Sequence, residues 1–336
     1  MSHLFAVTSR FASSSRSFFA TEASPDEEDV VLNEISAAIE KAPRAACKLC
    51  TAHIERLCRS GNLSAAARLL RSLQDKQLPV FSKAINVLLV AASEKNDIDL
   101  VSRVFIDAVA SSESLSSACY LNLANAFGRT NDCTRLLGLI EDVSELTFPS
   151  TKVLNRIIFA FGESRQVDQA LMVFDRIKSL NCKADLITHN IVFDLLGRAG
   201  LVDKMLKEFN SMKEASIFPD VVSYNTLLNS LTKVGRVGMC AVYYKEMGDS
   251  GIQPDLLTYT AMIEIFGRSG NVEESLRLFS EMKSKQIRPS IYIYRSLVNN
   301  LKKMGKLDLA TKLLEEMKSC STSNLARPSD FKPKRR

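Results

Sequence analysis

The chain has 336 residues, 46% hydrophobic and 24% charged, which suffices for a folded protein with a large buried surface. It has no tryptophan and only 7% aromatic residues, a mixture that favours helices over sheets, and no apolar run approaches the roughly 18–20 residues that span a bilayer. The net charge of +6 is too small to indicate a polyanionic partner unless the cations are suitably placed, and the eight scattered cysteines are typical of reduced thiols in an intracellular protein.

The first thirty residues differ in composition from the rest. Up to Ala20 the chain carries Arg10 and Arg16, several Ser and Phe and no acid, and acids then cluster at 26–29. A basic, acid-free start of this kind is typical of an organellar presequence. Residues 16–20 resemble a mitochondrial processing site, so we expect 1–30 to be a disordered mitochondrial targeting segment, with a chloroplast transit peptide as the alternative. Residues 31–46 are expected to be an N-terminal capping segment.

From residue 47 onward the sequence repeats itself. Segments 186–220, 221–255 and 256–290 align without gaps at 35 residues each, and the period extends in both directions. The predicted units are 47–81, 82–116, 117–150, 151–185, 186–220, 221–255, 256–290 and 291–325, followed by a basic disordered tail, 326–336. Each unit has two apolar stretches of helical spacing, and a lone hairpin cannot bury both faces. The units should therefore stack into an all-α solenoid.

Three positions within the unit support this interpretation. The fifteenth residue forms a glycine turn at Gly61, Gly200, Gly235, Gly270 and Gly305. The twenty-fourth is large and apolar in every unit: Leu70, Phe105, Ile140, Phe174, Phe209, Tyr244, Phe279 and Leu314. The twenty-seventh is Met212, Met247, Met282 and Met317 in the last four units. The last two positions share one helix face, so that face should be buried.

The unit resembles the pentatricopeptide repeat (PPR) family in its P class, the plant organellar type. The resemblance is carried by VSYNTLL at 222–228, GRV at 235–237, KEM at 245–247 and GIQPD at 251–255, and it covers 47–325. It implies a right-handed superhelix that binds single-stranded RNA, one base per repeat, with its N-terminus toward the RNA 5′ end. The tetratricopeptide repeat is the nearest alternative, but only one unit here has 34 residues and the Trp, Leu-Gly and Tyr of its first helix are missing.

In that family the fifth and the last residue of a repeat together select a base. The pairs here are Asn86 with Ser116, Asn155 with Asp185, Asn190 with Asp220, Asn225 with Asp255, and Thr260 with Ser290. An amide and a carboxylate offer a donor and acceptors to an open base edge. By resemblance, Asn with Asp favours U and Asn with Ser a pyrimidine, which implies a pyrimidine-rich target with a UUU core. The alternative is structural, with Asp as the N-cap of the next helix.

Two further sets of residues are candidates for contact with RNA. By resemblance, the second residue of a repeat sandwiches bases; it is Ile187, Val222, Leu257 and Tyr292 in the last four units. The thirteenth residue is basic at Arg59, Arg129, Arg198, Lys233, Arg268 and Lys303. Stacking would turn these cations into a ladder that follows a phosphate backbone, although cations also suit the C-terminal end of a helix.

Signals of enzymatic chemistry are weak. His53-Ile54-Glu55 matches the start of a zinc-deaminase signature, but no Pro-Cys-x-x-Cys follows it. Cys47, Cys50 and His53 recur every three residues, as core positions of a helix do. No nucleotide loop or nucleophile elbow occurs. We therefore expect no catalysis, metal, cofactor or small-molecule substrate.

These features together predict a sequence-specific binder of single-stranded RNA in an organelle. It would act in transcript stabilisation, processing, splicing or translation. The alternative is a structural or accessory component of an organellar ribosome or another ribonucleoprotein complex that acts through protein contacts. Ribosomal or splicing proteins are possible partners under either hypothesis.

Overall fold

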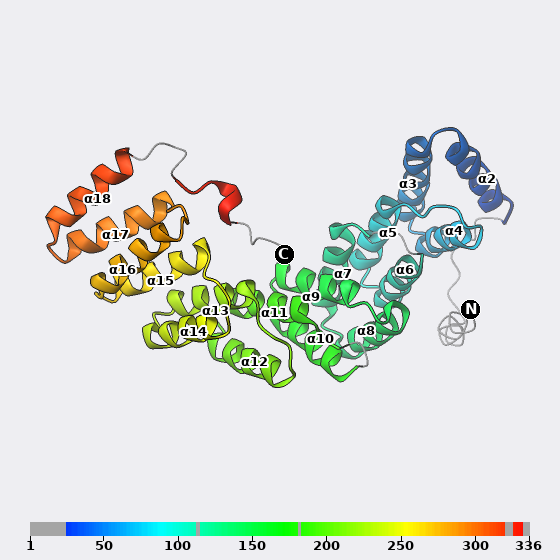
Figure 1. Cartoon of the computed structure of the whole chain (residues 1–336). Helices are drawn as coiled ribbons and strands as arrows, with labels where there is room; N and C mark the ends of the chain where they lie inside the picture. The colour runs from blue at the N-terminus through cyan, green and yellow to red at the C-terminus, as the bar shows by residue number, and fades with distance from the viewer. Residues whose placement is uncertain (1–24, 112–114, 181–182, 320–324, 332–336) are drawn as a thin grey trace. The chain divides into compact units, whose positions relative to one another are not determined.

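The computed structural model describes residues 25–111, 115–180, 183–319 and 325–331. These residues form 17 α-helices and one 3-10 turn and contain no strand (Figure 1). The chain divides into two compact units, Met1–Ala184 and Asp185–Arg336. Among the described helices, none is long and apolar enough to cross a membrane. The predicted all-α solenoid of helical hairpins is confirmed.

The first unit contains one N-terminal helix and four helical hairpins. Helix α2 (Pro25–Lys41) packs on both helices of the first hairpin. The hairpins are α3 (Pro43–Arg59) with α4 (Leu63–Asp75), α5 (Ser82–Glu94) with α6 (Ile98–Ala110), α7 (Ser117–Thr130) with α8 (Cys133–Thr147), and α9 (Lys152–Glu163) with α10 (Val167–Ser179). Helix α3 packs on α5, α5 on α7 and α7 on α9, so the first helices of successive hairpins stack side by side.

The second unit contains four more hairpins and a short C-terminal turn. The hairpins are α11 (Leu186–Arg198) with α12 (Val202–Glu214), α13 (Val221–Lys233) with α14 (Val237–Asp249), α15 (Leu256–Arg268) with α16 (Val272–Ser284), and α17 (Ile291–Lys303) with α18 (Leu307–Ser319). Their first helices stack in the order α11, α13, α15, α17. The turn η1 (Pro328–Phe331) contacts α15.

The hairpins match the predicted units except at the two ends. From α5 onward, each first helix begins at the first or second residue of its predicted unit. The expected boundary at residue 30 is wrong, because α2 runs through it and buries Leu32 and Ile35. The segment before the first hairpin, which was expected at 31–46, is the helix α2 at 25–41, and α3 begins at Pro43, whose ring suits the first turn of a helix. Residues 1–24 of the expected targeting segment lie outside the described residues.

The turn inside each hairpin requires a left-handed residue at one fixed place. Gly61, Gly200, Gly235, Gly270 and Gly305 all have φ between +73° and +87°. In the three units without glycine at this position, Asn96, Asn131 and Arg165 take φ of +54°, +50° and +60°. Every hairpin therefore reverses direction in the same way, whether or not glycine is present. The side chain of Arg165 makes its turn costlier, because a Cβ crowds the backbone at positive φ.

The predicted apolar stripe forms the core of both units. At the twenty-fourth position Leu70, Phe105, Ile140, Phe174, Phe209 and Phe279 are buried, and Tyr244 and Leu314 are half-buried. Met212, Met247 and Met282 are fully buried, whereas Met317 in the last hairpin is half-buried. Phe209 contacts Tyr224 edge-on across the hairpin boundary, with ring centroids 5.3 Å apart. The stripe thus joins each hairpin to the next.

Small residues set the spacing of the first helices in the second unit. A Cβ placed on Gly267 of α15 would lie 2.3 Å from Nδ2 of the buried Asn300 on α17. A Cβ on Gly197 of α11 would lie 2.3 Å from the hydroxyl of Ser230 on α13. Glycine at this position therefore lets the neighbouring first helix approach closely.

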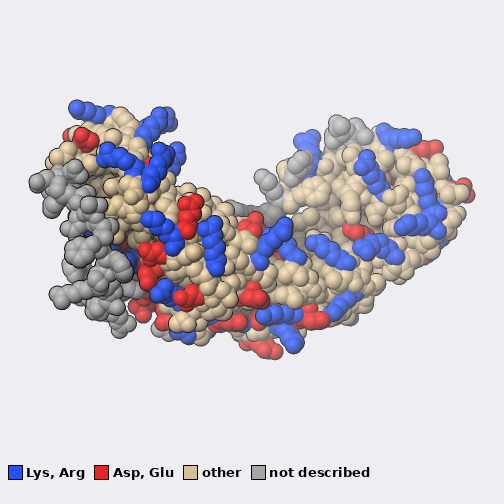
Figure 2. Space-filling model, turned by 180° about the vertical axis from the view of Figure 1, so that it is seen from behind, with Lys and Arg blue, Asp and Glu red and all other residues tan. Residues whose placement is uncertain are grey.

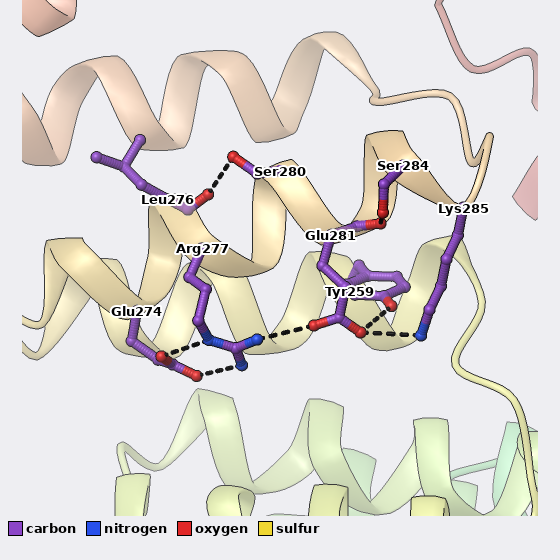
Figure 3. A network of polar contacts seen from close by, with 8 residues as sticks. All are labelled: Tyr259, Glu274, Leu276, Arg277, Ser280, Glu281, Ser284 and Lys285. Carbon is purple, nitrogen blue, oxygen red and sulfur yellow. Dashed lines mark hydrogen bonds and ion pairs between the residues drawn. The ribbon is translucent and has the colours of Figure 1, made fainter.

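In each of the last three hairpins, a polar contact fastens the two helices together. The hydroxyls of Tyr224, Tyr259 and Tyr294 each donate to a glutamate 22 residues later, at 2.8–2.9 Å. Figure 3 shows the middle case, where Glu281 of α16 accepts from Tyr259 of α15 and also pairs with Arg277 and Lys285. Burial works against ionisation of Glu281, but the bonds from Lys285 and Tyr259 outweigh it and lower its pKa.

The expected disordered tail is partly ordered. The backbone N–H of Ala326 donates to the carbonyl of Pro289 at 3.0 Å, and that of Arg327 donates to Asp330 at 2.9 Å. Residues 326–331 are therefore ordered at the boundary between the last two hairpins, and the prediction of disorder is wrong for them. Residues 332–336 lie outside the described residues.

Candidate RNA-binding face

The structure brings two of the predicted base-reading pairs together in the second unit. The side-chain amide of Asn190 donates to Asp220 at 3.2 Å, and that of Asn225 donates to Asp255 at 3.0 Å. In each pair the Asn lies on the first helix of one hairpin and the Asp directly before the first helix of the next. All four side chains are half-buried, so each pair keeps access to solvent.

The same aspartates are helix N-caps, as the structural alternative predicts. Asp185, Asp220 and Asp255 accept from the backbone N–H three residues later, at 2.7–3.0 Å, and each forms a capping box. Capping and pairing with Asn are compatible, because a carboxylate accepts several hydrogen bonds at once. The cap fixes the position of the carboxylate at the hairpin boundary, where it meets the amide.

A third residue that the sequence reasoning missed orients each amide. The hydroxyl of Ser223 lies 2.7 Å from the amide oxygen of Asn190, and that of Thr258 lies 2.6 Å from the amide oxygen of Asn225. The hydroxyl accepts from the backbone N–H of the preceding Asp, and of its two possible acceptors the Asn oxygen lies nearer than the Asp carboxylate, which lies at 2.9–3.1 Å. A Ser or Thr three residues after the capping Asp was the signal in the sequence.

The network leaves specific groups available to a ligand. Each Asn uses one of its two amide hydrogens on Asp and one lone pair of its oxygen on the hydroxyl. The contacts to Asp220 and Asp255 all converge on Oδ1, so Oδ2 takes no part in them. An N–H donor and a carboxylate acceptor therefore remain side by side, held in place by the three-residue network.

The other predicted pairs are arranged differently. The amide oxygen of Asn86 accepts from Asn122 at 2.7 Å, whereas the hydroxyl of Ser116 lies 3.3 Å from the Cys119 thiol. Asn155 is only 6% exposed, and its amide lies 3.5 Å from the Thr151 hydroxyl. Asn155 and Asp185 fall in different units, so their pairing stays a prediction.

The pair of Thr260 and Ser290 is also turned inward. Thr260 donates its hydroxyl hydrogen to the carbonyl of Leu256 in its own helix, at 2.6 Å. Ser290 is buried and caps α17 by accepting from the N–H of Ile293 at 3.3 Å. Both hydroxyls are therefore used within their own elements rather than on one another.

The predicted stacking residues are accessible. Ile187 is 62% and Tyr292 53% exposed, and Val222 and Leu257 are half-buried. Ile187 and Tyr292 thus present apolar surface on the first and the last of the four first helices of the second unit. Tyr292 also donates its hydroxyl hydrogen to Glu264 of the preceding first helix, at 2.8 Å.

The six cations at the thirteenth position are all exposed, but acids near them offset part of their charge. Arg198 pairs with Asp194 at 2.9 Å, Arg59 with Glu55 at 3.3 Å and Arg268 with Glu264 at 3.5 Å. Arg129 donates instead to the carbonyl of Ser93 at 3.3 Å. On the face shown in Figure 2, Lys and Arg side chains stand singly, with Asp and Glu between several of them.

The cysteine and histidine cluster near the N-terminus lies in the first hairpin. Cys50 is fully buried, and burial raises the pKa of its thiol to about 12. Burial also lowers the pKa of His53, whose ring contacts Arg56 at 3.0 Å. Within the described residues, no three His, Cys, Asp or Glu side chains are grouped so that they could hold a metal ion.

Comparison with protein families identifies the repeated unit. The PPR repeat family matches residues 186–232 and 219–266, the pentatricopeptide repeat domain matches 243–304 and 277–321, and the PPR repeat matches 153–182. A pentatricopeptide repeat-containing protein of Arabidopsis thaliana is 47% identical over 151 residues, which cover 44% of this chain and 41% of that protein.

A second curated relative is more distant. The small ribosomal subunit protein mL103 (rPPR7) of Arabidopsis thaliana is 24% identical over 144 residues, covering 42% of this chain and 35% of that protein. The matched regions thus span about two fifths or less of these curated relatives.

Two solved structures of repeat proteins are also similar to this chain. PPR10 from maize in complex with an 18-nt psaJ RNA element is 18% identical, with a TM-score of 0.49 over 97% of this chain and 48% of that one. The PPR domain of Arabidopsis thaliana protein-only RNase P 1 in complex with tRNA is 17% identical, with a TM-score of 0.45 over 52% of this chain and 93% of that domain.

Proposed function

We propose that this chain, which belongs to the pentatricopeptide repeat family, binds single-stranded RNA and reads it one base per repeat. The observation that carries the proposal is the network that recurs at Asn190–Asp220 and Asn225–Asp255. A network of the same geometry at successive hairpin boundaries presents the same donor and acceptor at regular intervals along the stack.

The chemistry of these pairs suits a pyrimidine base. Uracil exposes an N–H between two carbonyl oxygens on its open edge. The free amide hydrogen of Asn225 can donate to one carbonyl, and a carboxylate oxygen of Asp255 can accept from the N–H, directly or through water. The same applies to Asn190 with Asp220, and we extend it to Asn155 with Asp185, which makes UUU the proposed core of the target.

Stacking and charge would supply the remaining affinity. Ile187, Val222 and Leu257 offer apolar surface beside the reading pairs, and base stacking on side chains is worth about 1–3 kcal/mol per base. Lys233 and Lys303 lie exposed at the ends of their helices and would contact phosphate without regard to sequence. The chain thus separates base selection from backbone attachment.

Binding to short labelled RNAs tests the proposal. The full chain should prefer an oligonucleotide with a UUU core over one in which AAA replaces it. Replacing both Asn190 and Asn225 by Ala should reduce affinity for the UUU oligonucleotide by about tenfold or more, since each base that is read contributes about 1 kcal/mol or more. Asn210→Ala is the matched control, because Asn210 is exposed on the second helix α12, away from the pairs. Equal affinity of the double variant and the control would refute base reading.

We propose an organelle, the mitochondrion before the chloroplast, as the place of action. The basic, acid-free start of the chain supports this assignment. Import of a fluorescent protein fused behind residues 1–30 tests it, with Arg10 and Arg16 replaced as the control. The RNA would be a transcript whose stability, processing, splicing or translation depends on a bound protein.

A second candidate function is an accessory role in an organellar ribosome. The likeness to a protein named as part of a small ribosomal subunit favours it. Co-sedimentation of the tagged chain with ribosomes after mild nuclease treatment, without affinity for any free oligonucleotide, would decide for this role.

A further inference from the structure

The C-terminal segment 325–331 lies at the boundary between the hairpin of α15 and α16 and the last hairpin. The N–H of Ala326 donates to the carbonyl of Pro289 at 3.0 Å, and η1 contacts α15. Asp330 accepts from the N–H of Arg327 at 2.9 Å, which closes the turn. The segment therefore lies at the N-terminal edge of α17, at the hairpin boundary where Ser290 would read a base.

Burial at that edge distinguishes it from the two edges before it. Pro219 and Asp220 are half-buried, as are Pro254 and Asp255, whereas Pro289 and Ser290 are both buried. The three pairs occupy equivalent positions, the last two residues of their repeats. Pro289 and Ser290 are thus the covered pair among these three, while Ile291 and Tyr292 directly after them are exposed.

The reading network is also absent at this boundary. At the two preceding boundaries, the hydroxyls of Ser223 and Thr258 hold the amide of an Asn. The residue at the same repeat position here is Ile293, which has no hydroxyl. Thr260 and Ser290 each bond within their own element. The hydroxyl of Tyr292 is bonded to Glu264 at 2.8 Å, which links α17 to α15 across the adjoining surface.

We infer that residues 325–331 end the RNA track at the pair Asn225–Asp255, by covering the next boundary at Pro289 and Ser290. The inference rests on the proposed function and adds to it a limit on the length of RNA that the second unit reads. The segment occupies the position that the next nucleotide on the 3′ side of the UUU core would take, so that nucleotide makes no contact with Ser290. It can bind there only when the segment leaves.

The bond to Pro289 offers a selective way to release the segment. Ala326→Pro removes the donating N–H, whereas Ala326→Ser keeps it and is the matched control. Both changes lie outside the hairpins, so the fold of the repeats is preserved. Because the chain contains no tryptophan, Phe331→Trp in each background adds a single fluorophore to the segment. Its anisotropy without RNA should fall with Ala326→Pro and stay high with Ala326→Ser.

RNA length is the decisive readout. Each full-length protein is titrated with UUU oligonucleotides extended by zero to three nucleotides on the 3′ side, and with a second series extended on the 5′ side. With Ala326→Ser, affinity should not rise on adding the first 3′ nucleotide; with Ala326→Pro it should rise about fivefold or more, as one further stacked base would give. The 5′ series should not differ between the two variants.

The possible failures are distinguishable. If neither variant binds any oligonucleotide, the proposed function fails and this inference with it. If both bind with the same dependence on 3′ length, RNA binding stands and the inference is overturned. An unchanged anisotropy of the Ala326→Pro protein would mean that the bond to Pro289 does not hold the segment, which also overturns the inference.

Discussion

The side-chain amide of Asn225 donates a 3.0 Å hydrogen bond to Asp255, a residue that also caps the helix of the following repeat. One carboxylate thus serves the fold and the proposed reading of a base. Its removal would affect both, so loss of RNA binding alone would not separate the two roles. The chain offers a way to separate them, because Ser290 caps the next helix with a hydroxyl.

Asp255→Ser should keep the helix cap and lose base selection. A serine cap stabilises a helix nearly as well as aspartate, so the free energy of unfolding should change by less than about 0.5 kcal/mol, whereas Asp255→Ala should cost about 1 kcal/mol. Both variants should lose the preference for U at one position of the target. Urea denaturation measures the free energy of unfolding, and binding to RNAs that differ at single bases measures the preference for U. An unchanged preference in Asp255→Ser would leave capping as the role of this residue.

Arg165→Gly should stabilise the first unit. Arg165 holds φ at +60° in a turn where five other repeats have glycine, and positive φ costs a residue with a Cβ about 1 kcal/mol. The reverse change, Gly235→Ala at φ +74°, should destabilise the second unit by a similar amount. The midpoint of urea unfolding is the measurement. A lower midpoint for Arg165→Gly would show that the arginine side chain contributes more than its backbone costs.

Gly267→Ala should destabilise the contact between α15 and α17. Its Cβ would lie 2.3 Å from Nδ2 of Asn300, and such crowding of a packed interface typically costs about 1–3 kcal/mol. Asn300→Ala should relieve the crowding, so the double variant should lose less stability than the sum of the single variants. Gly248→Ala is the control, because nothing lies near its added Cβ and alanine favours the helix. Additive single effects would contradict the close approach.

Stability at alkaline pH should depend on Tyr224. Burial, together with its bond to Glu246, raises the pKa of this phenol from about 10 to about 12. The folded state therefore disfavours the phenolate, and the resulting stability is fully present below pH 10 and lost as pH rises from 10 through 12. Tyr224→Phe removes this titration, so its unfolding midpoint should fall less steeply over that range than that of the parent chain. If the unfolding midpoints of the variant and the parent chain fell equally steeply with pH, groups other than Tyr224 would account for the loss of stability.

Replacing Lys233 and Lys303 should weaken RNA binding equally for all sequences. Both side chains are exposed at the proposed phosphate-contacting position. Each phosphate that is no longer neutralised should reduce the slope of log affinity against log salt by about 0.7 for a single strand. Lys245→Ala is the control, because Lys245 is exposed on the second helix α14. A slope that stays the same in the double variant would show that these lysines do not touch the backbone of the RNA.

The repeat architecture was predictable because its signals are local. Gly235 needs a positive φ, Phe209 and Met212 lie three residues apart on one helix face, and Pro254 cannot continue a helix. Such features act within a few residues and recur in phase in several units, which indicates where each hairpin begins. The ends were harder: α2 begins at Pro25, before the expected boundary, and packs on the first hairpin, a contact between helices that the repeat pattern does not contain.

The reading pairs were predictable as residues but not as a network. Resemblance to a family pointed to Asn190 and Asp220, whereas the role of Ser223 follows from stacking, which brings its hydroxyl within 2.7 Å of an amide 33 residues away. The bond from Ala326 to Pro289 was likewise invisible in the sequence.

The periodic sequence therefore specifies the helices, their turns and their order, since these follow from backbone conformation and from the burial of one helix face. Which side chains meet across hairpins depends on the distance between stacked helices, and that distance comes from packing at residues such as Gly267 and Asn300. Contacts of this kind join positions about 30 residues apart, and no pattern within one repeat encodes them.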